Sequence, residues 1–81
     1  MRLNVRFFAS HQEAMGSERL TMEMPEGATV GQLLDRLVRD HPGLRQLEEH
    51  TMVAVNHEQA ERDQKLHDGD EVAFYPPVSG G

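Results

Sequence analysis

One amphipathic helix constrains the fold of this chain more than any other feature of its sequence. Between Thr29 and His41, apolar residues recur at the spacing i, i+3, i+4, i+7 and i+8, which forms one stripe along a helix. The stripe consists of Val30, Leu33, Leu34, Leu37 and Val38. Thr29 is a favoured N-cap residue, and Pro42 disfavours helical geometry at its predecessor, so both ends of the helix are marked. A single helix of this kind predicts a domain in which the stripe packs against a sheet.

Four segments alternate apolar with polar residues, as strands with one buried face do. They are residues 2–8, 18–24, 51–56 and 71–75. The first two are joined by a connection short enough for a hairpin, so we expect them to be antiparallel neighbours. Together with the helix, they predict a two-layer α+β domain: a mixed sheet of four to five strands with one main helix packed on one face.

The segments between these elements carry weaker patterns. Residues 9–16 are consistent with a loop or one helical turn that ends at Gly16, and residues 44–50 with a short turn. Residues 57–64 show no apolar period and are expected to be irregular, while Leu66 is expected to anchor the next segment in the core. Asp68 and Gly69 predict a tight turn over residues 67–70, because Asp-Gly supplies the positive backbone angles of such turns.

Length and charge limit the classes of function. The chain has 81 residues, enough for one small domain, which we place at residues 1–75 with a tail at residues 76–81. Eight basic and fourteen acidic residues give a net charge of −6, which argues against binding to nucleic acid or to anionic membranes and favours a basic partner. Charged residues interrupt the N-terminal segment, so we expect no signal peptide or membrane-spanning helix and a cytoplasmic location.

Cysteine and histidine usage narrows the possible chemistry. The chain has no cysteine, which excludes disulfides, thiolate metal sites and a cysteine nucleophile. The histidines show no metal-binding spacing, so we expect no metal site and interpret them as surface residues: His11, His41, His50, His57 and His67. Met22, Met24 and Met52 are interpreted as residues that fill the core.

The C-terminal residues carry the main functional signal. No charged side chain follows Glu71, and the last six residues are Pro76, Pro77, Val78, Ser79, Gly80 and Gly81. The prolines favour an extended backbone, and the glycines leave the terminal carboxylate without a Cβ in its way. Such a tail fits a narrow tunnel in a partner protein, where the Gly81 carboxylate could react. The alternative is that two terminal glycines are an incidental feature of a flexible end.

The run from Asp68 to Gly81 closely resembles the end of the sulfur-carrier subunit family of molybdopterin synthase. Residues 5–9 and 53–56 also resemble the first and third strands of that family. The order of elements resembles the ubiquitin-like β-grasp fold, which the family shares with the thiamine sulfur carrier and ubiquitin. The resemblance covers nearly the whole chain, and its Pro-Pro-Val-Ser-Gly-Gly ending is more specific than Gly-Gly alone.

This resemblance implies a non-catalytic carrier with no permanently bound cofactor. An adenylyltransferase similar to ubiquitin-activating enzymes would use ATP and magnesium to adenylate the Gly81 carboxylate, since a carboxylate needs a leaving group before sulfur attacks it. A sulfur donor such as a cysteine desulfurase or a rhodanese-like protein would then produce a thiocarboxylate. In a heterotetramer with the large catalytic subunit, the tail would deliver sulfur to cyclic pyranopterin monophosphate and form the dithiolene of the molybdenum cofactor.

The resemblance also implies a surface for these partners. Phe8 and Tyr75 are both expected on the outer face of the sheet, and the first and last strands of a β-grasp are neighbours. The two side chains would then form an aromatic patch beside the tail, where aromatic residues often anchor a partner. At the corresponding positions of the irregular segment, Gln59 and Ala60 are less apolar than is usual in the family. In an alternative arrangement, Phe8 packs beneath a loop or beside Leu44.

Three other functions fit the same sequence. They are a sulfur carrier for thiamine or another pathway, a ubiquitin-like modifier joined to lysines, and a binding module in which the Gly-Gly ending has no role. The thiamine carrier usually lacks the double proline, and a modifier forms isopeptide-linked species rather than a thiocarboxylate. For the binding module, deletion of Gly80 and Gly81 would change nothing.

Overall fold

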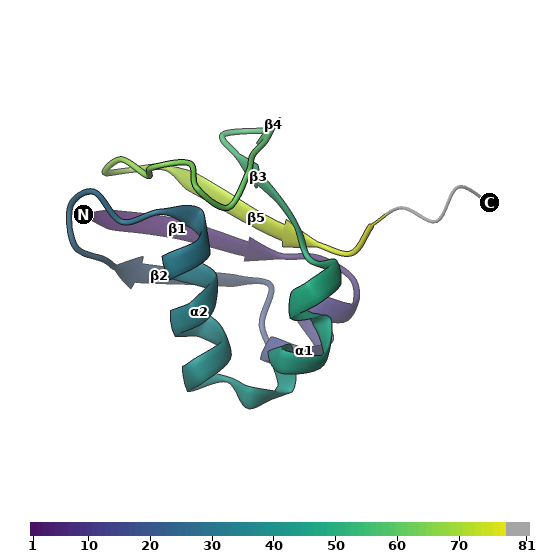
Figure 1. Cartoon of the computed structure of the whole chain (residues 1–81). Coiled ribbons are helices and arrows are strands. Elements are labelled where there is room, and N and C mark those ends of the chain that lie inside the picture. The colour runs from purple at the N-terminus through teal and green to yellow at the C-terminus, as the bar shows by residue number, and fades with distance from the viewer. Residues whose placement is uncertain (78–81) are drawn as a thin grey trace.

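The structure, a computed structural model, describes residues 1–77 and contains a five-stranded mixed sheet with one long helix packed on one side (Figure 1). The predicted α+β architecture is therefore confirmed. The elements are β1 (Arg2–Phe7), α1 (Ser10–Met15), β2 (Arg19–Glu23), α2 (Val30–Asp40), the 3₁₀ helix η1 (Pro42–His50), β3 (Met52–Val55), β4 (Glu58–Gln59) and β5 (Glu71–Tyr75).

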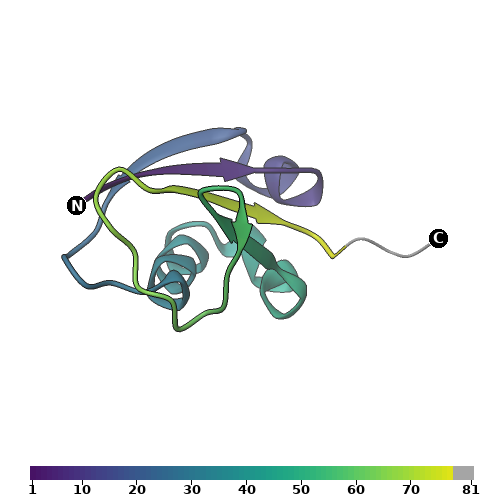
Figure 2. The same cartoon turned by 90° about the horizontal axis from the view of Figure 1, so that it is seen from above.

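The first and last strands are neighbours within the sheet. The strand order is β2-β1-β5-β3-β4, with β1 and β5 parallel and the other pairs antiparallel. Figures 1 and 2 show the arrows of β1 and β5 side by side and pointing to the same end of the sheet. Phe8 follows β1 and Tyr75 ends β5. The two residues therefore lie at the same end of the sheet, although they are far apart in sequence.

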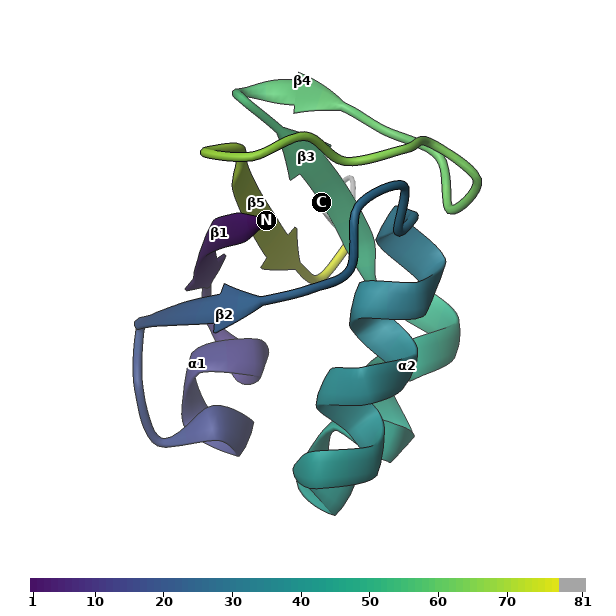
Figure 3. The same cartoon turned by 90° about the vertical axis from the view of Figure 1, so that its left-hand side faces the viewer.

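The core lies between the sheet and α2, which Figure 3 shows on one side of the curved sheet. Alternate residues of the strands meet the apolar stripe of α2, as the two periodicities predict. Each of these side chains is at most 6% exposed: Leu3, Val5, Phe7, Val53, Val55, Val72 and Phe74 from the sheet, and Val30, Leu33, Leu34, Leu37 and Val38 from α2. Leu44 and Leu66 are also buried, which confirms Leu66 as a core anchor.

Both predicted ends of α2 are confirmed, and their hydrogen bonds explain them. The Thr29 hydroxyl accepts a hydrogen bond from the Gln32 backbone N–H at 3.2 Å, while the Gln32 side chain accepts one from the Thr29 N–H at 2.9 Å. This reciprocal capping box satisfies two backbone donors at the start of the helix. His41 caps the other end, and Pro42 begins η1.

Several connecting segments are more regular than the sequence predicts. Residues 9–16 contain the short helix α1, which ends at Gly16 with a φ of 73°. The 3₁₀ helix η1 covers nine residues rather than a short turn, and the segment expected to be irregular contains the two-residue strand β4. The predicted tight turn is confirmed, with Gly69 at a φ of 86°.

Two side-chain placements differ from the expectations. His11 is not a surface residue: it is 2% exposed, because α1 packs on η1 and directs the imidazole toward Thr51. Met24 is buried and Met22 packs partly against the core, but Met52 does not belong to the core. Met52 pairs with Tyr75 across β3 and β5, so its side chain shares the outer face with Tyr75.

Candidate docking site on the outer face of the sheet

The face of the sheet turned away from α2, the outer face, carries an exposed aromatic ring beside the end of β1. Phe8 is 39% exposed and is the only large exposed hydrophobic residue among residues 1–77. Its backbone N–H donates a hydrogen bond to the carbonyl oxygen of Phe74 at 3.1 Å, which extends the contact between β1 and β5 by one residue. The expected outward position of Phe8 is confirmed, and the alternative in which it packs beneath a loop or beside Leu44 is wrong.

Tyr75 ends β5 next to Phe8 and is half-buried. It pairs with Met52 of β3, so an aromatic and a flexible thioether side chain lie together where β5 ends. Pro76, half-buried, and Pro77, exposed, follow directly. The apolar end of the outer face therefore adjoins the point where the chain leaves the sheet.

Phe8 and Tyr75 line the same shallow hollow, of about 280 Å³. The other residues that line it are Arg6, Ala54, His57, Glu71 and Ala73. Ala54 and Ala73 lie directly opposite each other on β3 and β5, and these small side chains leave space between their larger neighbours. The Arg6 guanidinium carbon lies 5.0 Å from the centroid of the Phe8 ring, a cation–π contact that places a positive charge at the edge of the hollow.

The opposite side of the hollow is built from the turn between β3 and β4. Asn56 and His57 have φ values of 50° and 72°, as a tight two-residue hairpin turn requires. The Asn56 amide holds this turn against the start of β5: it donates to Asp70 Oδ1 at 2.9 Å and accepts from the Glu71 N–H at 3.0 Å. His57 Nε2 lies 3.3 Å from Glu71 Oε2. The hollow thus has apolar walls and charged groups on two sides.

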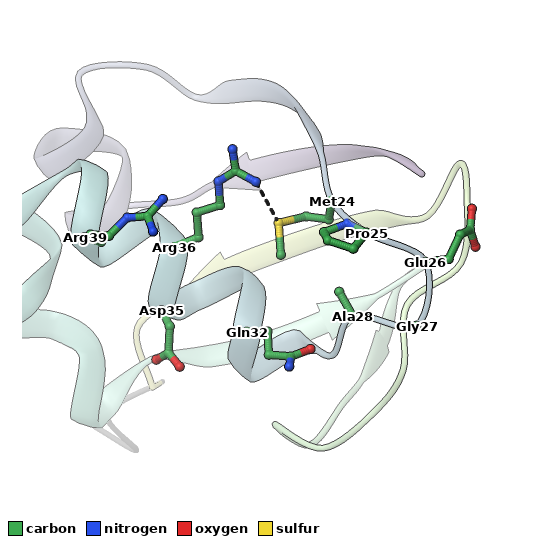
Figure 4. A pocket seen from close by; sticks show the side chains of 9 residues that line it. All are labelled: Met24, Pro25, Glu26, Gly27, Ala28, Gln32, Asp35, Arg36 and Arg39. Atoms are coloured by element: carbon green, nitrogen blue, oxygen red, sulfur yellow. Dashed lines mark hydrogen bonds between the residues drawn. The ribbon is translucent and has the colours of Figure 1, made fainter.

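A larger hollow, of about 570 Å³, lies between α2 and the loop that precedes it (Figure 4). It adjoins the sheet edge where β1 begins, far from the end of β5. Arg36 donates hydrogen bonds to the Glu23 carbonyl oxygen at 3.2 Å and to Met24 Sδ at 3.6 Å, and Arg39 lies 3.3 Å from Asp40. Arg36 therefore ties the loop to the helix, while Arg39 pairs with the next residue of the helix.

With its aromatic rings and small alanine side chains, the outer-face hollow can bind an apolar side chain. In the part of the chain that the structure describes, no three His, Asp or Glu residues are grouped to hold a metal ion. In the same residues, no helix is long and apolar enough to cross a membrane.

The structure brings together some of the predicted site residues. Phe8 and Tyr75 share one hollow, and Pro76 and Pro77 adjoin it. The remaining tail residues, Val78, Ser79, Gly80 and Gly81, lie outside the described residues.

Other residues of the outer face were missed by the sequence interpretation. Ala54, Ala73 and Met52 lie beside Phe8 and Tyr75, and strand alternation alone could have assigned all three to this face. Gln59 pairs with Ala54 and is exposed, which adds a polar group at the far side. Ala60 instead packs partly against the core.

Curated relatives match the chain over nearly its whole length. The molybdopterin synthase sulfur carrier subunit of Chlamydomonas reinhardtii is 37% identical, with 100% of both chains covered. The protein of the same description from Mycobacterium tuberculosis is 39% identical, covering 100% of this chain and 99% of its own length. Small archaeal modifier protein 1 of Haloferax volcanii is 38% identical, covering 94% of this chain and 97% of its own length.

Solved structures show the same fold. The crystal structure of small archaeal modifier protein 1 from Haloferax volcanii has a TM-score of 0.88 and 35% identity, with 100% of both chains covered. A complex of subunits 1 and 2 of the molybdopterin-converting factor from Helicobacter pylori contains a chain with a TM-score of 0.72 and 24% identity, with 100% of both chains covered. A ubiquitin from Caldiarchaeum subterraneum has a TM-score of 0.66 and 17% identity, covering 100% of this chain and 98% of its own.

The model of the ThiS family matches residues 5–81, which is nearly the entire sequence. The relatives and the structural neighbours agree with this match, and the likeness to ubiquitin establishes the β-grasp fold. This chain therefore belongs to the ThiS family of ubiquitin-like β-grasp proteins and is similar to the sulfur carrier subunits of molybdopterin synthase.

Proposed function

We propose that this chain is the sulfur-carrier subunit of a molybdopterin synthase. The observation that carries the proposal is the match to named sulfur carrier subunits over the full length of both chains. Two features of this chain support it: an uncharged ending of two prolines and two glycines, and an apolar hollow beside the strand that leads into this ending. By this proposal, the chain presents its terminus to enzymes that perform the catalysis.

The reactive group in this proposal is the α-carboxylate of Gly81. One carboxylate oxygen attacks the α-phosphorus of ATP, pyrophosphate leaves, and an acyl-adenylate forms on the activating enzyme, which also binds the magnesium. The outer sulfur of a persulfide on the donor protein then attacks the acyl carbon and displaces AMP. A thiol next cleaves the S–S bond that joins the two proteins, and it is oxidised to a disulfide with the donor cysteine. Adenylation is needed because a free carboxylate is a poor electrophile with no adequate leaving group. The product is a C-terminal thiocarboxylate.

The loaded terminus then transfers its sulfur inside a larger assembly. The relatives from Chlamydomonas reinhardtii and Mycobacterium tuberculosis are named subunits of a synthase, and the Helicobacter pylori structure is itself a complex of two subunits. By this proposal, the large subunit binds the outer face through Phe8 and Tyr75 and receives Pro76 to Gly81 in its active site. The sulfur acceptor is cyclic pyranopterin monophosphate, and two loaded termini in succession supply the two sulfur atoms of the dithiolene of the molybdenum cofactor.

The experiment that tests the carrier function is mass analysis of the C-terminal peptide. The chain is expressed with an activating enzyme and a sulfur source, treated with a thiol-directed alkylating agent, and digested with trypsin. Cleavage after Lys65 yields residues 66–81, which contain no methionine. This matters because exchange of oxygen for sulfur adds nearly the same mass as methionine oxidation does. An alkylated Gly81 supports the proposal, whereas an unmodified carboxylate beside an active enzyme control contradicts it.

A matched variant makes this experiment sharper. Deletion of Gly81 moves the terminal carboxylate by one residue and leaves residues 1–75 unchanged. We expect the truncated chain to unfold at the same temperature as the full chain but to remain without sulfur. A truncated chain that is loaded as well as the full chain would remove Gly81 from the mechanism.

A second candidate function is that of a ubiquitin-like protein modifier. The relative named small archaeal modifier protein 1 is as similar to this chain as the sulfur carriers are, at 38% identity. A modifier would join its Gly81 carboxylate to lysine amines of other proteins. Its test is a search for tryptic peptides with lysines linked to residues 66–81, because the chain contains no cleavage site after Lys65. Such conjugates without any thiocarboxylate would favour the modifier over the carrier.

A further inference from the structure

Two arginines face each other on the outer face next to the hollow. Arg6 of β1 and Arg19 of β2 are direct cross-strand partners, and Arg6 is also the partner of Ala73 on β5. Ala73 in turn pairs with Ala54. One straight row across the sheet therefore runs from two cationic side chains to the two small side chains in the hollow. Since paired residues point to the same face, all four lie on the outer face.

This arginine pair has no internal counterion. Within residues 1–77, no carboxylate oxygen lies within the 4.0 Å ion-pair distance of Arg6 or Arg19. By contrast, the arginine at the other end of β1, Arg2, lies 3.3 Å from its cross-strand partner Glu23. Glu71, an acidic residue on the same face, lines a shallow hollow with both arginines, but its carboxylate lies 3.3 Å from His57.

Such an arrangement opposes folding. Like charges placed directly opposite each other on neighbouring strands destabilise a sheet. Arg6 partly compensates by lying over the ring of Phe8, which holds its charge beside the hollow, while Arg19 is exposed. The chain has fourteen acidic residues against eight basic ones, so the charge of this pair is also opposite in sign to that of the whole protein.

We infer that Arg6 and Arg19 form an anion-recognition pair, which binds a carboxylate side chain of the docking partner while an apolar side chain of the same partner fills the adjacent hollow. Charge complementarity selects the acidic side chain, because two guanidinium groups on one face supply several charged N–H donors. The small side chains of Ala54 and Ala73 select the apolar one. This inference rests on the proposed function, in which the partner on this face is the large subunit of molybdopterin synthase.

The test is titration of the large subunit from the same organism with the full chain and its variants, by calorimetry at low and high salt. The variant is Arg19→Glu, because the cation–π contact with Phe8 is made by Arg6 and stays in place. Arg19→Gln removes the charge without reversing it. The matched control is Arg45→Glu, which makes the same change of charge at an exposed position on η1. We expect Arg19→Glu to raise Kd about tenfold or more and Arg45→Glu to change it less than about twofold. The effect of Arg19→Glu should shrink at high salt.

A second measurement separates recognition from a role in folding. Because Arg19→Glu replaces a repulsive pair with an attractive one, the free variant should unfold at a temperature about 1 to 6 °C higher than the parent chain. Higher thermal stability together with weaker binding supports the inference.

Each other outcome overturns it. Loss of both stability and affinity would show that Arg19 serves the fold. Equal binding by the Arg19→Glu and Arg45→Glu variants would overturn the inference and leave the proposed function standing. Dimerisation of the parent chain that Arg19→Glu abolishes would assign the pair to a contact between two copies instead. If the parent chain itself does not bind the large subunit, the proposed function fails, and the inference fails with it.

Discussion

Two consecutive phenylalanines show how different the two faces of this sheet are. Phe7 is 1% exposed and stacks on Phe74 with 6.2 Å between ring centroids and 21° between ring planes. Phe8 is 39% exposed, and the Arg6 guanidinium lies over its ring. The same residue type, one position apart, therefore lies in a packed core in one case and on an open surface in the other.

The two faces of the sheet therefore differ in role: one stabilises the fold, and the other is suited to binding a partner. The helix-covered face contains side chains whose position is explained by burial of apolar surface. The outer face contains features that lower stability or solubility without an internal reason, namely an exposed aromatic ring and a pair of facing arginines. Features of this kind are explained when a partner covers them.

The largest expected effect is a loss of stability, caused by a substitution on the helix-covered face of the sheet. Phe74→Ala should lower the free energy of unfolding by about 3–5 kcal/mol, because it removes the ring that stacks on Phe7 and leaves a cavity. Its neighbour on the outer face, Tyr75→Ala, should cost only about 1 kcal/mol. Urea denaturation followed by circular dichroism measures both, and Phe74→Leu replaces Phe74→Ala if that variant does not fold. Equal losses at the two positions would show that the faces do not differ in packing.

The next prediction concerns the outer face. Phe8→Asp should weaken binding of the large synthase subunit by about 30-fold or more, as expected for an aromatic anchor worth about 2 kcal/mol. The free energy of unfolding should change by about 1 kcal/mol or less, since the ring is exposed in the free chain. Calorimetric titration and urea denaturation of the same preparation provide the comparison. If stability and affinity fall by equal amounts, Phe8 is part of the core rather than of the docking surface.

His11 provides a polar exception within the buried face. The Thr51 hydroxyl donates to the Leu47 carbonyl oxygen at 2.6 Å, so Thr51 Oγ1 accepts the 2.7 Å hydrogen bond from His11 Nε2–H. His11 Nδ1 is then an unprotonated, buried nitrogen without a hydrogen-bond partner in the described residues. Burial disfavours the charged imidazolium and lowers the pKa of His11 below its ordinary value of 6.5.

This lowered pKa makes stability depend on pH. Below pH 6.5 the unfolded chain binds a proton at His11 more readily than the folded chain does. The contribution of this site to the free energy of unfolding should therefore be complete above pH 6.5 and should decrease as the pH falls below that value. His11→Leu should remove this component, whereas His67→Gln, at an exposed position, should retain it. Urea midpoints near pH ~7.5 and pH ~5.5 measure the difference. Parallel pH profiles for the parent chain and His11→Leu would contradict the prediction.

The smallest expected effect comes from a substitution in the turn between β1 and α1. Ala9 has φ 50° and ψ −123°, the first central position of a type II′ turn that the His11 N–H closes onto the Phe8 carbonyl oxygen at 3.0 Å. Glycine adopts this conformation without strain, so Ala9→Gly should raise the free energy of unfolding by about 0.5–1 kcal/mol. Ala14→Gly, within α1, should lower it by about 1 kcal/mol. Thermal unfolding of the two variants distinguishes them, and destabilisation by both would show that Ala9 is not strained.

Local patterns predicted much of the fold but not all of the site. The stripe of α2 and the alternation in β1 identified their buried residues correctly, because each pattern repeats over several turns or residues. Burial of His11 could not be predicted, since it is the only buried residue of the short helix α1 and therefore forms no pattern. The residue type of Met52 favours the core, whereas its alternation with Val53 correctly indicates the other face.

By itself, the sequence determined which residues of each strand share a face and that one helix covers one side of the sheet. These features follow from periods of 2.0 and 3.6 residues, which are properties of the local backbone. The sequence also predicted that β1 and β2 are neighbours, but only the tertiary structure decided the register in which the strands pair. Pairing of β1 with both β2 and β5 brings Arg6 opposite Arg19 and beside Ala73, and it places Phe8 next to Tyr75. Such register between segments distant in sequence depends on how all apolar faces fit into one core, which no local pattern contains.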